Sequence, residues 1–119
     1  MEKQLGKVTI APEVLVTIAR LTALKTPGVA RLDTHIMDGV NRVFKRGASN
    51  GGVKVEVDGN SVSVELHVIA EHDANMLTLG QQIQTAISRA IREMVGMSVT
   101  EVNVYIQDVM LPGDRGVTE

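Results

Sequence analysis

The sequence predicts an α+β domain, a two-layer sandwich in which two helices pack on one face of a mostly antiparallel sheet of three to four strands. Two segments, residues 12–25 and 75–95, repeat apolar residues at steps of three and four, as amphipathic helices do. Residues 53–70 and 99–109 instead alternate apolar and polar side chains, as half-buried strands do. The chain has 119 residues, 44% of them hydrophobic, which suffices for one core.

The first elements are a short strand and a helix. Lys7–Ile10 is β-branched and alternating, so we expect a strand there. Pro12 suits the first turn of a helix, which the apolar spacing carries to Lys25, and Pro27 and Gly28 then end it. Val29–Leu32 fits either a short strand or the return of the chain to the sheet.

Residues 33–52 show no clear periodicity and are rich in glycine, so we interpret them as a surface excursion. A helical turn over residues 38–46 would place Arg42, Lys45 and Arg46 on one face. These three side chains form a candidate basic patch for protein interaction. The alternative is a solvated face that ends in a flexible loop.

The central and C-terminal elements carry the clearest patterns. Val53–Val57 and Val62–Ala70 flank the turn Asp58-Gly59-Asn60 and predict a hairpin with one apolar face. Asp73 or Asn75 can cap the long helix that follows, and Gly96 ends it. Val99–Val109 predicts the last strand.

Composition narrows the function classes. The chain has no cysteine, so neither disulfides nor thiol chemistry are available, and the cytoplasm is the expected compartment. No apolar run approaches the roughly 20 residues of a membrane span, so we expect no direct membrane insertion. Aromatic residues make up 2% and the net charge is −2, so we expect no general nucleic-acid binding. Residues 1–50 carry +4 and residues 51–119 carry −6.

No catalytic machinery is evident. Neither helix follows a glycine-rich phosphate loop. The best metal candidate is a set of five side chains, and a metal-dependent enzyme would centre on its two histidines: Glu65, His67, Glu71, His72 and Asp73. Nothing elsewhere in the sequence completes the ligand shell. An acid-base role for His35 would need partners that the sequence does not identify. We therefore expect no catalytic residue, cofactor or metal.

The polar face of the hairpin offers a contact surface instead. His67 and Ile69 lie on that face by alternation, and Tyr105 lies on the last strand. A sheet that exposes one face can bind another copy or a partner through such side chains. We take His67, Ile69 and Tyr105 as candidate protein-interaction residues, with a solvated sheet as the alternative.

Two blocks of the sequence resemble the alkaline shock protein family of Gram-positive bacteria, also called envelope stress response proteins. The first runs from Gly6 through Val8-Thr9-Ile10-Ala11-Pro12-Glu13-Val14 to Pro27-Gly28-Val29. The second begins at Gly52 and ends on Glu101-Val102-Asn103-Val104-Tyr105-Ile106. Residues 33–52 depart from the family pattern.

The resemblance implies a single domain over residues 1–111, and the sequence Pro112-Gly113-Asp114-Arg115-Gly116 indicates a frayed tail over residues 112–119. It also implies a non-enzymatic cytoplasmic protein of the cell-envelope stress response, a scaffold or adaptor that self-associates as a homo-oligomer. A small membrane-anchor protein would hold it peripherally at the membrane. The alternative is a regulatory module that acts on a metabolic enzyme, such as one of fatty-acid synthesis, or on nucleic acid through its basic patch.

Overall fold

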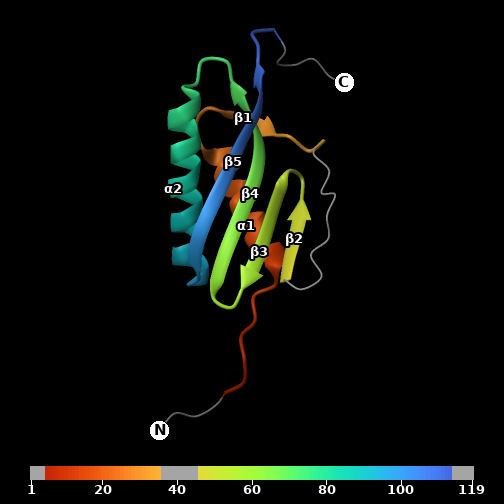
Figure 1. Cartoon of the computed structure of the whole chain (residues 1–119), viewed down its shortest axis with the longest axis vertical. Coiled ribbons are helices and arrows are strands. Elements are labelled where there is room, and N and C mark those ends of the chain that lie inside the picture. Colours follow the sequence, from red (N-terminus) through yellow and green to blue (C-terminus); the bar gives the residue numbers. More distant parts are fainter. Residues whose placement is uncertain (1–4, 36–45, 114–119) are drawn as a thin grey trace.

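The hairpin expected in the middle of the chain is the centre of a five-stranded sheet (Figure 1). The computed structural model describes residues 5–35 and 46–113. Along the chain the elements are α1 (Pro12–Lys25), β1 (Val29–Leu32), β2 (Arg46–Asn50), β3 (Val53–Asp58), β4 (Ser61–Glu71), α2 (Met76–Val95) and β5 (Ser98–Met110). The α+β class and the two helices are therefore confirmed.

β4 is the central strand, and three other strands pair with it. β3 lies antiparallel along residues 61–66 of β4, and β1 lies antiparallel along residues 68–70. Both occupy the same edge, because His67 of β4 donates its backbone N–H to Gly52 and accepts at its carbonyl from Asp33. β5 runs parallel to β4 along the whole opposite edge, and β2 extends the sheet beyond β3.

Both helices cover the apolar face of the sheet. Figure 1 shows α1 behind the strands and α2 alongside β5, and the two helices also contact each other. Asn75 caps α2, because its Oδ1 accepts from the backbone N–H of Thr78 at 3.0 Å, and Gly96 ends this helix at φ 80°. The core is one cluster, in which α2 contributes Leu79, Ile83, Ile87 and Ile91 and β4 contributes Val62, Val64, Leu66, Val68 and Ala70.

The expected strand at Lys7–Ile10 is wrong. Residues 5–11 form neither helix nor strand, and Val8 is 90% exposed. An alternating apolar pattern stabilises a strand only where a neighbour pairs with it and one face is buried, and Val8 has no such burial. The short piece at Val29–Leu32, in contrast, is the strand β1.

The expected surface excursion over residues 33–52 is also wrong at its end. β2 lies at Arg46–Asn50 and pairs with β3, so Arg46 begins a strand and does not end a helical turn. A Cβ on Gly47 would meet the carbonyl oxygen of Val55 at 2.7 Å, so glycine permits this close pairing. The rest of the expected turn, residues 38–45, lies outside the described residues.

Candidate functional site

The face of the sheet opposite the helices is the candidate site, and we call it the open face. It is built by alternation: while Val64, Leu66 and Val68 of β4 enter the core, the residues between them point to the other side. The antiparallel register places Lys54 beside Glu65, and the parallel register places Tyr105 beside His67. The open face is thus polar, with charged residues of both signs.

His67 is the centre of the open face and is held on three sides. Its Nε2 lies 3.0 Å from Oε2 of Glu65, and its Nδ1 lies 3.1 Å from Oε1 of Gln107. Its ring stacks on that of Tyr105, with centroids 4.9 Å apart and an angle of 15° between the planes. A carboxylate can only accept, so Nε2–H donates to Glu65, whereas the amide of Gln107 can serve Nδ1 as acceptor or donor.

This arrangement fixes an aromatic pair on the surface. The side chain of His67 is 15% exposed, while Tyr105 is 45% exposed, so the stack offers mainly the tyrosine ring to solvent. Because neighbours already hold His67, the surface that supports Tyr105 would lose little side-chain freedom when a partner binds. The structure therefore brings together two of the three residues expected on this face.

Ile69 is the third expected residue, and its position differs from the expectation. It lies on the same side of β4 as His67 and pairs with Asp108 of β5 and Arg31 of β1. Only 7% of it is exposed, however, so it supports the surface more than it offers contact area.

Of the three residues of the expected basic patch, the structure describes Arg46 alone. Arg42 and Lys45 lie outside the described residues. Arg46 is exposed at the start of β2, and its Nη2 donates to the carbonyl oxygen of Ile10 at 3.1 Å, which ties the N-terminal segment to the sheet edge.

The histidines considered for metal or acid-base chemistry lie in different segments: His35 in the turn after β1, His67 in β4 and His72 in the turn after β4. Within residues 5–35 and 46–113, no three or more His, Asp or Glu side chains gather closely enough to hold a metal ion. His35 is 86% exposed, and its Nδ1 lies 3.6 Å from Oδ1 of Asp33. No helix in the described part of the chain is long and apolar enough to cross a membrane.

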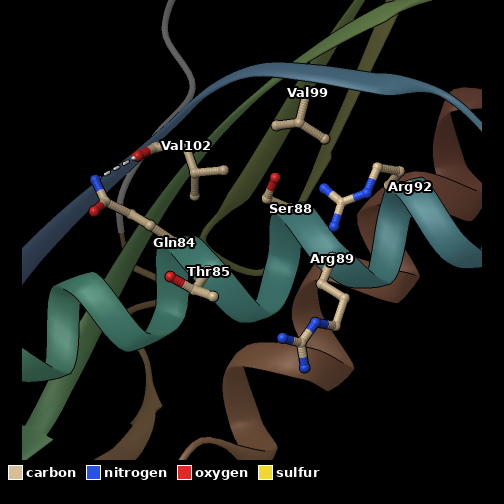
Figure 2. Close-up of a pocket in the computed structure, with 7 residues that line it drawn as sticks. All are labelled: Gln84, Thr85, Ser88, Arg89, Arg92, Val99 and Val102. Carbon is tan, nitrogen blue, oxygen red and sulfur yellow. Dashed lines mark hydrogen bonds between the residues drawn. The ribbon is translucent and has the colours of Figure 1, made fainter.

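The sequence did not predict two features of the surface. Gln107 completes the shell of His67, and alternation with Tyr105 gave a weak signal for it, but its contact with β4 depends on a parallel register that no local pattern encodes. The second feature is a groove between α2 and β5 (Figure 2). The periodicity of α2 indicates which of its side chains are polar and exposed, but it does not show that β5 lies beside them.

A family model named for alkaline shock protein 23 and described as having a cell envelope-related function matches residues 1–111. YqhY of Bacillus subtilis is 28% identical over 105 residues, which cover 88% of this chain and 78% of YqhY. YloU of the same organism is 23% identical over 106 residues, covering 87% of this chain and 88% of YloU.

A shorter match joins the chain to a stress response regulator gls24 homolog of Streptococcus pyogenes. It is 33% identical over 58 residues, which cover 49% of this chain and 32% of the relative. Among solved structures, a MamM CTD chain covers 81% of this chain and 95% of its own length, at 11% identity and a TM-score of 0.49.

Proposed function

The chain belongs to the alkaline shock protein 23 family, whose function is cell envelope-related, and from this premise we propose that it is a non-enzymatic scaffold or adaptor of envelope homeostasis. It acts by self-association and by binding a membrane-anchor partner, which holds it at the cytoplasmic side of the membrane. The match to a stress response regulator supports a role when the envelope is under stress.

The observation that carries this proposal is the stack of Tyr105 on His67. Tyrosine is enriched among the residues that dominate binding energies, because it buries a large ring with few rotatable bonds. Tyr105 is 45% exposed, and the pairing of β5 with β4 fixes its position beside His67. A rigid aromatic side chain ringed by polar groups has the anatomy of an interface centre.

Self-association is tested by light scattering over a concentration series of the full chain. We expect the average mass to rise with concentration, and Tyr105→Ala to weaken association by about tenfold or more, as loss of a central interface residue does. Leu77→Ala is the matched control, because Leu77 is 72% exposed on α2, away from the open face. A strict monomer at every concentration would contradict self-association.

The anchor partner is tested by photo-crosslinking in the native cell. A photoreactive residue is placed at Tyr105 in one strain and at Leu77 in another, and the membrane fraction is analysed. We expect a discrete membrane-protein adduct at position 105 only. Equal adducts at both positions, or none in the membrane fraction, would argue against an anchor that binds the open face.

A further inference from the structure

A groove separates α2 from β5, with a cavity volume of about 350 Å³. Figure 2 shows Val99 and Val102 of β5 facing Ser88 and Arg92 of α2 across it. The volume falls within the range of about 300–1,000 Å³ that ligand sites occupy. The two valines give the groove an apolar wall, while the helix gives it a polar one.

The groove is electropositive. The described residues that line it include Arg89 and Arg92 and no acidic side chain. Neither arginine forms an ion pair within the described part of the chain. Figure 2 shows Arg92 reaching toward Ser88 inside the groove and Arg89 pointing away from β5 on the outer side of the helix. Arg92 is therefore placed for direct contact, and Arg89 adds to the positive potential only from a distance.

The groove also runs along a strand edge. β5 pairs with β4 on one side, and no described strand pairs with its other side. The side-chain Nε2 of Gln84 donates to the backbone oxygen of Val102 at 3.1 Å, as the dashed line in Figure 2 marks. At this point a side-chain amide takes the place that the backbone N–H of a further strand would take. An unpaired strand edge is a template for strand addition.

We propose that this groove binds an extended acidic segment of a partner protein, which adds to the outer edge of β5 as a further strand. Its backbone N–H replaces Gln84 at Val102, and one of its carboxylates pairs with Arg92. A second copy of this chain is a poorer occupant, because a two-fold pairing of β5 edges would set two electropositive grooves against each other. The site is separate from the open face and does not depend on the proposed function.

The test uses the full chain and the fluorescein-labelled peptide TVEVEVT, with binding followed by fluorescence anisotropy. We expect Arg92→Gln to weaken binding about tenfold, as loss of one charge pair worth roughly 1.4 kcal/mol does. Arg89→Gln is the matched control on the same helix and should weaken it less than about threefold, because Arg89 lines the groove but its guanidinium group points away from β5. Gln84→Ala should leave binding unchanged or strengthen it, since the peptide displaces this side chain.

A second peptide separates strand addition from simple charge attraction. TVEVEVT with alternate backbone nitrogens methylated keeps its carboxylates but cannot donate to a strand edge, so we expect its binding to be lost. Equal binding of the methylated peptide would overturn strand addition, and equal effects of the two arginine variants would overturn the assigned contact. Competition between the peptide and a concentration-dependent dimer would overturn the choice of occupant in favour of a second copy.

Discussion

Gly52 stands where the ends of β1 and β3 meet on β4. Its φ is 88°, and a Cβ at this position would lie 2.8 Å from the carbonyl oxygen of Asp33 and 3.3 Å from that of His67. The carbonyl oxygen of Gly52 accepts a hydrogen bond from the backbone N–H of His67, whose ring supports Tyr105. One glycine therefore connects the packing of three strands with the geometry of the open face.

Gly52→Ala should lower the free energy of unfolding by about 2–4 kcal/mol, because it combines a strained backbone with a contact that backbone atoms cannot relieve. Urea denaturation measures the change. Gly59→Ala is the matched control, since Gly59 has φ 62° but nothing within 4 Å of its added Cβ, and it should cost only about 1 kcal/mol. Equal losses for the two variants would show that the close contact at Gly52 contributes nothing.

At the scale of elements, residues 7–10 and β4 show why similar patterns have different outcomes. Val8 and Val64 both sit in alternating β-branched stretches, yet Val8 is 90% exposed and Val64 is fully buried. Local sequence sets the preference for an extended backbone, and only the neighbouring strands decide whether the side chain is removed from water.

Val64→Ala should therefore lower the free energy of unfolding by about 2 kcal/mol, through lost burial and the cavity left behind. Val8→Ala should change it by no more than about 0.5 kcal/mol, as a substitution on an exposed segment does. Thermal and urea unfolding of both variants provide the comparison. A large loss at Val8 would mean that residues 7–10 pair with another part of the molecule.

The elements with strong internal periodicity could be predicted from the sequence, and those that depend on remote pairing could not. The β3–β4 hairpin and α2 follow from alternation, a turn and a cap at Asn75. β2 has the sequence RGASN, which shows no strand pattern and forms by pairing with β3. Its one local signal is Gly51-Gly52, where both φ angles are positive, as a tight two-residue hairpin turn requires.

The candidate site was predictable in part for the same reason. Alternation alone placed His67 and Tyr105 on polar strand faces. That they stack follows from the register of two parallel strands joined by a helix, and this register shifts twice, between Val62 and Ser63 and between Val68 and Ile69. Each shift changes which residues lie side by side on the two strands, so no local pattern reveals that Gln107 reaches His67.

At the scale of the whole molecule, both helices and strands of every part of the sheet contribute to one core cluster. The cluster joins Leu15 of α1, Leu32 of β1, Val53 of β3 and Val102 of β5 to the apolar residues of β4 and α2. A single core of this kind leaves no part able to keep its packing once another part is lost. Unfolding should therefore be a single cooperative transition.

Tyr105 tests this expectation, because it is the only tyrosine and the chain has no tryptophan. Its fluorescence reports on the docking of β5 at His67, whereas far-ultraviolet circular dichroism reports mainly on the helices. We expect both signals to give the same midpoint in urea. Separate midpoints would show that β5 leaves the sheet before the helices unfold, and that the molecule is less cooperative than its core suggests.

The position of β5 bears on how the protein is made. β4 receives its partner strands from both directions along the chain, and β5, the partner on its whole second edge, leaves the ribosome only after β4 and α2. Until residues 98–110 emerge, the growing polypeptide holds an incomplete sheet with an unsealed valine-rich strand. Synthesis that stalls after α2 would thus leave a nascent chain prone to aggregation and dependent on chaperones.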